Sequence, residues 1–352
     1  MDNYARPIEE RIDWLFEHAK RHSVEFSSPE TWLAQKRYLA EHPTAISVLK
    51  CMDGRINLSV ATATPIGIIQ PFRNLGGRFD LGWPHLGEVY SHHVAHVVGE
   101  GRRVLTLITY HYSKGDPRRG CAGFDYDTEA AVAHVHEVKA QLEFAFGGAH
   151  GTVYPVVCGF ETDGDALVLH GANGETLDLS SLTEADKPSL PVLLERLFPD
   201  MHEQVRKDLL PLVHGNLEHI ERVRRTKREI DAEHREWMLC IGRGFDWLHL
   251  PNRALIIGPY SPNLAEPIRK AAIIIHANMR RGRIPDDGFL LLATVPYYEI
   301  GSDRARAELK SRFMCRFASD VIREEFPELA ERMHVRAAVL DWRSRELEPI
   351  PI

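Results

Sequence analysis

Cys51, Asp53 and Arg55 stand at alternate positions in the stretch SVLKCMDGRINL, directly after a short apolar run. A second apolar run, LTLITYHY, carries His111, and the glycine-rich stretch beyond it carries Cys121. Two thiolates and one imidazole are a usual catalytic zinc set, which leaves the fourth tetrahedral position for water or a substrate. Zinc suits these ligands better than magnesium or calcium, which prefer oxygen. Each residue alone would more often be an inert buried thiol or a loop histidine, so the set as a whole favours a metal site.

Asp53 and Arg55 add proton chemistry to this set. On an extended backbone they share a face with Cys51, and a nearby guanidinium holds a carboxylate ionised and oriented. An ionised aspartate beside a zinc-bound water can accept its proton. The alternative is a surface ion pair worth less than about 1 kcal/mol, which is the weaker interpretation when three candidate ligands accompany the pair.

The surrounding elements must bring these residues together. Apolar periodicity predicts helices over 7–21, 27–43, 85–101 and 127–146, strands over 45–51, 66–72 and 102–112, and a β-hairpin over 151–171. We expect 171–188 to be loop-like and 189–237 to be helical with breaks near Pro199 and Pro211. Alternation of strands and helices indicates a mostly parallel α/β sheet. Ligands gather at the carboxyl ends of the strands of such a sheet, where Cys51 and His111 would lie.

The second half of the chain repeats the first. LKCMDGRINL has a counterpart in MLCIGRGFDWL, GIIQPFRNL in LIIGPYSPNL, LTLITYHYSKGD in LLLATVPYYEIG, and VVCGFETDGDALVL in AAVLDWRSRELEPI. Because the four matches keep one order and a nearly constant offset, the sequence predicts an internal duplication.

The order of these motifs resembles the β-class carbonic anhydrases. That family has a Cys-x-Asp-x-Arg motif, an Arg-Asn-x-(Ala/Gly) motif and a His…Cys-Gly motif, matched here by CMDGR, by RNLGG and by His111 with GCAG. The resemblance covers roughly 8–170. It implies zinc ligation by Cys51, His111 and Cys121, a catalytic dyad of Asp53 and Arg55, and reversible hydration of CO2 to bicarbonate by Zn-bound hydroxide. It leaves open whether Asp53 ligates zinc in a resting state.

The resemblance also implies a pocket with some departures from the family. The pocket residues would be Gln70, Asn74, Leu75 and Ala122. Gln70 replaces an aromatic residue and Ala122 replaces a glycine, while nine residues separate His111 from Cys121 where common members have two. Divergent branches, including carboxysome-shell enzymes and subunits of inorganic-carbon uptake complexes, also have a wide gap. The alternatives are a related zinc hydrolase acting on carbonyl sulfide or carbon disulfide, and a non-catalytic bicarbonate-binding subunit.

The carboxysomal branch resembles a fused pair with one inactive copy. Here Cys240 is retained, but Gly242 replaces Asp53 and Pro296 replaces His111, and proline cannot ligate zinc. We therefore expect an α/β fold of two tandem β-carbonic-anhydrase-like units, each a mostly parallel sheet flanked by helices, forming an intrachain pseudo-dimer with one zinc. The expected parts are a helical arm at 1–45, a catalytic domain at 46–175, a helical linker at 176–235 and a metal-free second unit at 236–352.

Composition limits the partners. The net charge of −7 and pI near 6.3 give no reason to expect nucleic acid or an anionic membrane, and the apolar runs are too short to span a bilayer. Five cysteines do not suggest a disulfide framework, so we expect a cytoplasmic location. The expected ligands are CO2 and bicarbonate, and a homo-oligomer of pseudo-dimers is compatible with the family. A carboxysome or uptake-complex partner is possible but has no support in the sequence, because only about 45 residues precede the first strand.

Overall fold

The computed structural model describes residues 3–147, 151–226 and 233–352. These residues form two compact units, which we name by the sheet each contains. The first-sheet unit comprises the described residues of Ala34–Cys51 and Ile56–Ala232, and the second-sheet unit those of Met1–Leu33, Met52–Arg55 and Glu233–Ile352. No helix in these described stretches is long and apolar enough to cross a membrane.

The first sheet has six strands in the order β2-β1-β3-β4-β5-β6. Its strands are β1 (Ala45–Cys51), β2 (Ile69–Asn74), β3 (Val104–Tyr112), β4 (Val153–Glu161), β5 (Ala166–His170) and β6 (Thr176–Asp178). The strands β2, β1, β3 and β4 pair in parallel, whereas β4, β5 and β6 pair antiparallel. The strands β1 and β4 are buried along their whole length, as expected for parallel strands covered on both faces.

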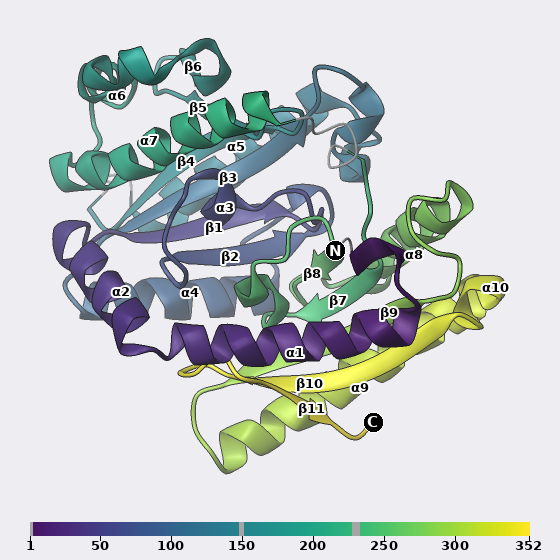
Figure 1. Cartoon of the computed structure of the whole chain (residues 1–352). Helices are drawn as coiled ribbons and strands as arrows, with labels where there is room; N and C mark the ends of the chain where they lie inside the picture. Colours follow the sequence, from purple (N-terminus) through teal and green to yellow (C-terminus); the bar gives the residue numbers. More distant parts are fainter. Residues whose placement is uncertain (1–2, 148–150, 227–232) are drawn as a thin grey trace. The chain divides into compact units, whose positions relative to one another are not determined.

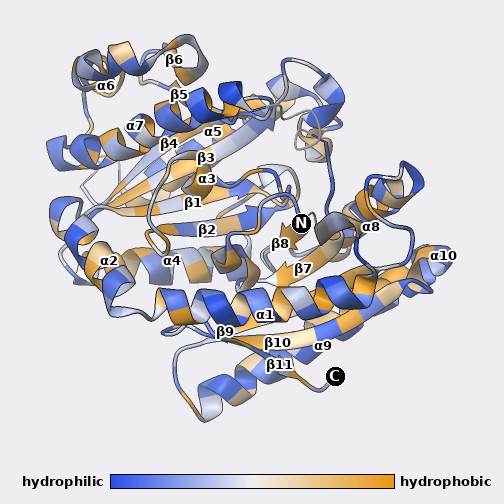
Figure 2. Cartoon of the chain, in the orientation of Figure 1, coloured by the Kyte–Doolittle hydropathy of each residue, from blue (hydrophilic) through white to orange (hydrophobic). Residues whose placement is uncertain are grey.

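Helices cover this sheet. They are α3 (Leu58–Ala61), α4 (Pro84–Gly99), α5 (Thr128–Phe146), α6 (Leu190–Leu197) and α7 (Glu203–Arg225). The helices α4 and α5 pack on β3, α5 also contacts β4, and α7 contacts α3, β3 and β5. In Figure 2 the strands of the sheet are largely hydrophobic, whereas the helices carry many hydrophilic residues. Burial of apolar strands beneath amphipathic helices therefore builds this core.

The second sheet repeats the strand order of the first, as β8-β7-β9-β10-β11. Its strands are β7 (Met238–Gly242), β8 (Ala254–Ile257), β9 (Phe289–Tyr297), β10 (Met333–Asp341) and β11 (Leu347–Ile350). The first four are parallel and β10–β11 is an antiparallel hairpin, as β4–β5 is in the first sheet. Two tandem β-carbonic-anhydrase-like units, predicted from the repeat, are therefore confirmed at the level of topology.

The helices of the second-sheet unit include one from the far end of the chain. They are α1 (Ile8–Phe26), α8 (Ala265–Arg280), α9 (Ser302–Glu325) and α10 (Pro327–Ala330), while α2 (Pro29–Glu41) runs from one unit into the other. Helix α1 is first in the chain, yet it packs on β9 and β11 and runs beside β10 and β11 in Figure 1. Helix α7, which precedes β7 in sequence, packs instead on the first sheet. The leading helix of each half thus packs on the sheet of the other half.

Most predicted elements are confirmed, including the hairpin and the exact bounds of the strand at 45–51. Two predictions were wrong in part. The 171–188 stretch contains the short strand β6 and two 3-10 helices. The helical stretch is interrupted near Pro199, but Pro211 lies inside α7. The buried apolar face of α7 outweighs one lost backbone hydrogen bond at a half-buried proline. Part of the predicted 189–237 helix, residues 227–232, lies outside the described residues.

Candidate metal centre and catalytic dyad

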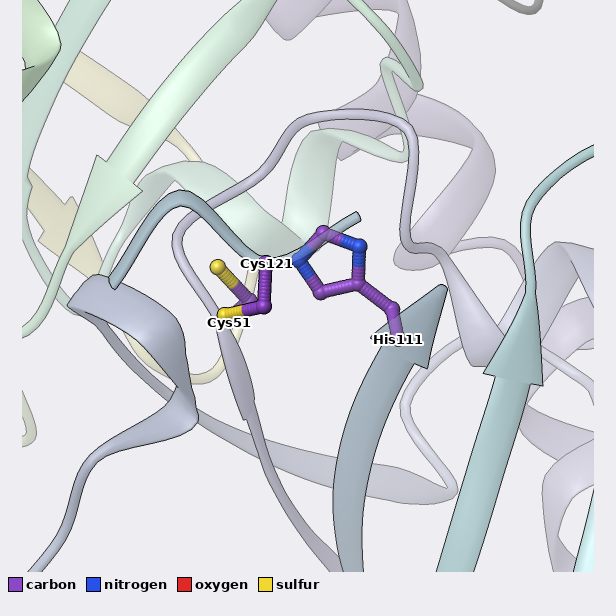
Figure 3. Close-up of side chains that lie close together, drawn as sticks. All are labelled: Cys51, His111 and Cys121. Atoms are coloured by element: carbon purple, nitrogen blue, oxygen red, sulfur yellow. The ribbon is translucent and has the colours of Figure 1, made fainter. Parts of the chain in front are cut away.

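Cys51, His111 and Cys121 converge in the first-sheet unit. Their ligand atoms all lie within 4.8 Å of one another, and the residues are only 4%, 2% and 2% exposed. Figure 3 shows the His111 ring extending from a strand end toward the two sulfurs. The structure thus brings together three residues that are 60 and 10 positions apart in the chain.

The sheet explains this convergence. Cys51 is the last residue of β1, and His111 is the penultimate residue of β3. The two strands are parallel neighbours, with Leu49 paired to Ile108, so their carboxyl ends open at the same edge. The chain then leaves β3 after Tyr112, and the loop 113–120 returns Cys121 to that edge.

Glycines allow the close approach that seats Cys121. Gly76 has φ +70°, and a Cβ on Gly123 would lie 2.5 Å from the Gly76 Cα atom. Gly77 has φ +66°, and a Cβ there would meet the carbonyl oxygen of Thr109 at 2.9 Å. The segment after β2 therefore packs backbone against backbone with the Cys121 loop, which explains the paired glycines of RNLGG.

We expect Gly123→Ala to weaken metal binding, because the new Cβ would force the Cys121 loop away from Gly76. Overpacking of this kind costs about 1–3 kcal/mol of stability. Zinc affinity and thermal unfolding of the variant measure the two effects. Gly99→Ala is a matched control, since a Cβ at Gly99 has no atom within 4 Å. Equal zinc affinity in Gly123→Ala and the wild type would contradict the role of this contact.

The donor set fits a zinc ion. In a tetrahedron with bonds of about 2.0–2.3 Å, neighbouring ligand atoms lie about 3.3–3.8 Å apart, within the 4.8 Å limit found here. All five cysteines of the chain are buried thiols and none forms a disulfide. Two thiols and an imidazole in a buried site favour a soft or borderline metal, and three protein ligands leave one position open.

Arg73 fixes the two ends of the segment that follows Cys51. Its guanidinium donates to the carbonyl oxygen of Cys51 at 3.1 Å and to that of Ile56 at 2.9 Å. Arg73 is only 3% exposed, so these charge-assisted bonds lie in a low-dielectric setting where they are strong. The arginine of RNLGG therefore holds both ends of the loop that carries Asp53 and Arg55.

Asp53 and Arg55 form a buried ion pair within the second-sheet unit. Arg55 Nη2 lies 2.6 Å from Asp53 Oδ2, Arg55 Nε lies 3.1 Å from Oδ1, and the Arg55 backbone N–H also donates to Oδ1 at 2.9 Å. The two side chains are each 4% exposed. This fork fixes the direction of the carboxylate, as the sequence predicted for an oriented pair.

His234 and Glu236 extend this pair, and the sequence analysis missed both. Arg55 Nη2 lies 3.1 Å from His234 Nε2, and His234 Nδ1 lies 3.0 Å from both carboxylate oxygens of Glu236. Glu236 also accepts the backbone N–H of Gly54 at 3.2 Å. The one sequence signal was the alternation of His234 and Glu236 just before an apolar run, which alone says nothing about a partner some 180 positions earlier.

The trio Asp53, His234 and Glu236 has the spacing of a metal site, with ligand atoms within 4.8 Å of one another. The Arg55 guanidinium, however, contacts both Asp53 and His234, and a second cation at this point would be repelled. The carboxylates and the imidazole are better described as a hydrogen-bonded chain that orients Arg55 and the backbone of Gly54.

The four predicted pocket residues do not all lie near the strand ends. Asn74 is paired with Cys51 across β1 and β2, Leu75 is the next residue and is buried, and Ala122 directly follows Cys121. Gln70 pairs with Ser47, four residues before Cys51, which is about 13 Å along a strand. The structure therefore brings three of the four to the strand ends, and a pocket role for each stays a prediction.

At the corresponding edge of the second sheet, the loop after β7 closes on β9. Gly242 has φ +113°, and a Cβ there would lie 1.9 Å from the carbonyl oxygen of Thr294. The next two backbone N–H groups donate to the carbonyl and the hydroxyl of Thr294, both at 3.1 Å. Burial, with a contribution from Asp246, raises the pKa of Cys240 well above that of an ordinary thiol. Cys240 is thus a core thiol.

Comparison with known proteins agrees with this geometry. Residues 37–186 match the family described as Carboxysome Shell Carbonic Anhydrase, catalytic domain. A carboxysome shell carbonic anhydrase of Hydrogenovibrio crunogenus is 28% identical over 182 residues, which cover 46% of this chain and 34% of the relative. One of Prochlorococcus marinus subsp. pastoris is 24% identical over 238 residues, which cover 59% of this chain and 47% of the relative.

The solved structure of the β-carbonic anhydrase CcaA aligns with 48% of this chain and 92% of its own, at 13% identity and a TM-score of 0.36. The chain spans less than half the length of the carboxysome shell relatives that it matches. The matched stretch of 37–186 includes all three converging ligand residues and the Asp53–Arg55 pair. Residues 37–186 of this chain are therefore similar to the catalytic domain of carboxysome shell carbonic anhydrases.

Proposed function

We propose that this protein is a zinc-dependent carbonic anhydrase that interconverts CO2 and bicarbonate at a single site. The observation that carries the proposal is the buried convergence of Cys51, His111 and Cys121. The match of 37–186 to a carbonic anhydrase catalytic domain supports CO2 and bicarbonate as the substrates. The similar proteins are also named carbonic anhydrases.

In this proposal Cys51, His111 and Cys121 would hold the metal. When bound, the metal would act as a Lewis acid that makes water nucleophilic near neutral pH. Asp53 follows Cys51 by two residues, so their Cα atoms lie within about 7 Å whatever the path of the chain. Asp53 would present its carboxylate as a proton acceptor, and two hydrogen bonds from the Arg55 guanidinium would hold it in one orientation. Asn74, Leu75 and Ala122 would line the place where CO2 approaches.

The second half would bind no catalytic metal. Two replacements support this part of the proposal. Pro296, the counterpart of His111, has no metal-binding side-chain atom, and Gly242 is the counterpart of Asp53. The contact of Gly242 with Thr294 leaves no room for a side chain. The domain at 46–175 would thus hold the metal, and the domain at 236–352 would hold none.

Metal analysis with an activity assay tests this proposal. We expect about one zinc per chain and rapid CO2 hydration in stopped-flow measurements. Cys240→Ala should change neither value, because Cys240 is a core thiol with 0% exposure. Two zinc ions per wild-type chain, or loss of zinc in Cys240→Ala, would refute the single-site proposal.

The substrate is tested in the same way. Carbonyl sulfide and carbon disulfide would meet the same nucleophile, so turnover of these analogues without CO2 hydration would replace carbonic anhydrase by a related zinc hydrolase. Zinc bound without either activity would leave the non-catalytic bicarbonate-binding role.

A carboxysome shell enters the proposal through the names of the relatives. Those names support a shell partner, which the sequence alone left possible but without support, and the partner is a proposal for this chain. Co-purification of the chain with shell proteins from its native cells tests it, and purification without them would contradict it.

A further inference from the structure

One carboxylate holds the loop that separates the two ligands His111 and Cys121. Asp163 accepts the Ser113 hydroxyl at 2.8 and 2.9 Å and the Gly115 backbone N–H at 2.8 Å. Arg119 Nη1 lies 3.6 Å from the same carboxylate. Three residues spread along the loop thus contact one side chain, which lies some 50 positions farther along the chain.

The charge state of Asp163 suits this role. Burial alone would raise the pKa of Asp163, but the hydrogen bonds from Gly115 and Ser113 outweigh it, and its pKa lies below the usual value. Glu161, by contrast, has its pKa raised by burial, and it accepts the backbone N–H groups of Asp163 and Gly164. Asp163 is therefore ionised near neutral pH, and the Glu161 carboxylate fixes its backbone.

The turn that carries Asp163 is a firm base. It connects β4 to β5, and Thr162 donates both its backbone N–H and its hydroxyl to the carbonyl of Tyr112, at 2.9 and 3.1 Å. On its other side, His219 and Asn216 of α7 contact Asp165, each at 2.8 Å. The turn is thus joined both to the residue after His111 and to a long helix.

The second half of the chain provides an internal comparison. Its corresponding hairpin turn makes the same first bond, from the Trp342 N–H to the Tyr297 carbonyl at 2.9 Å. Arg345 has φ +58°, as Asp165 has φ +54°. Arg343 stands where the first half has Asp163, and it is exposed.

The two hairpins differ in the same way as the loops beside them. In the second half the chain passes from Tyr297 into α9 at Ser302 within a few residues, so there is no long loop to hold. The hairpin itself therefore folds without an acid at this position. The acid is present in the half where a widened loop must return a metal ligand.

We propose that Asp163 is a positioning residue for the metal centre: it orders the Tyr112–Gly120 loop so that Cys121 meets Cys51 and His111. A nine-residue loop that is already ordered loses less entropy when the metal binds. The inference rests on the proposed function only in taking these three residues as the zinc ligands.

The test compares Asp163→Asn and Asp163→Ala in the full chain, depleted of metal and reloaded with zinc. Groups that hydrogen-bond a metal ligand typically contribute about 10- to 100-fold in affinity. Asp163 contacts the loop between two ligands, so we expect zinc binding to weaken by about 10-fold, the lower end of this range. A competing chromophoric chelator measures the dissociation constant. Cobalt(II) substitution adds a second readout, since the thiolate-to-cobalt bands should weaken when Cys121 is misplaced.

The matched control is Asp178→Asn. Asp178 anchors the same loop through Lys114 at 3.1 Å, but that ion pair is largely exposed, so its loss should leave the zinc affinity near that of the wild type. Thermal unfolding of the metal-free forms should be similar for all variants, because the second hairpin folds without this acid.

The outcomes separate the two proposals. Equal zinc affinity in wild type and Asp163→Asn would overturn the positioning role, as would a loss of affinity matched by lower thermal stability without metal. A wild type that binds zinc but hydrates no CO2 would overturn the proposed function and leave the role of Asp163 standing. A wild type that binds no zinc would overturn both.

Discussion

His111→Ala should remove zinc from the chain and lower CO2 hydration by at least about 10³-fold. Two thiolates remain, but a three-coordinate protein site would lose its imidazole and with it most of its hold on the metal. A 10³-fold loss of rate means an activation barrier higher by about 4 kcal/mol. This is a modest share of the barrier lowering that a metal supplies as a Lewis acid and as the source of a nucleophile.

Zinc per chain by elemental analysis and stopped-flow CO2 hydration measure this effect. His111 is 2% exposed, so its truncation also leaves a cavity, and the unfolding temperature must be compared with that of the metal-free wild type. His92→Ala is the control, because His92 lies exposed on α4. A His111→Ala variant that retains one zinc and its activity would exclude the proposed ligand set.

The sequence predicted the strands and helices of the first half because their apolar patterns are strong. The run AISVLKC is mostly apolar and follows a proline, and the structure has β1 at Ala45–Cys51. The helix predicted over 85–101 is α4 at Pro84–Gly99. The duplicated order of motifs carried the topology, since a repeated strand order follows from a repeated series of elements.

The convergence of Cys51 with His111 was predictable because the carboxyl ends of neighbouring parallel strands open at one edge. The roles of His234 and Glu236 were not predictable, since the contacts of His234 with Arg55 and of Glu236 with Gly54 depend on how segments far apart in sequence pack. Periodicity reports which face of an element is buried, but not which distant segment covers it. The packing of α1 on β9 and β11 escaped prediction for the same reason.

Asp53→Asn should retain about one zinc yet lower CO2 hydration by about 10²- to 10⁴-fold, the range for removal of a positioned acid or base. Asparagine keeps the size of the side chain and one oxygen acceptor for Arg55, but it cannot take up a proton. Zinc content and the stopped-flow rate, measured on the same sample, distinguish loss of proton handling from loss of metal.

Stability is the competing explanation, because Asp53→Asn leaves the guanidinium of Arg55, 4% exposed in its side chain, without its carboxylate. Breaking a buried pair by removing one charge costs up to about 3–5 kcal/mol, which a lower unfolding temperature would reveal. Glu236→Gln removes a different buried carboxylate, which reaches Arg55 only through His234. If Asp53 handles the proton and Glu236 only orients its partners, Glu236→Gln should lower the rate far less than Asp53→Asn even where both lower the unfolding temperature. Equal rates in the two variants would mean that the dyad acts through the order of its loop, and the proton would then have to leave by another group.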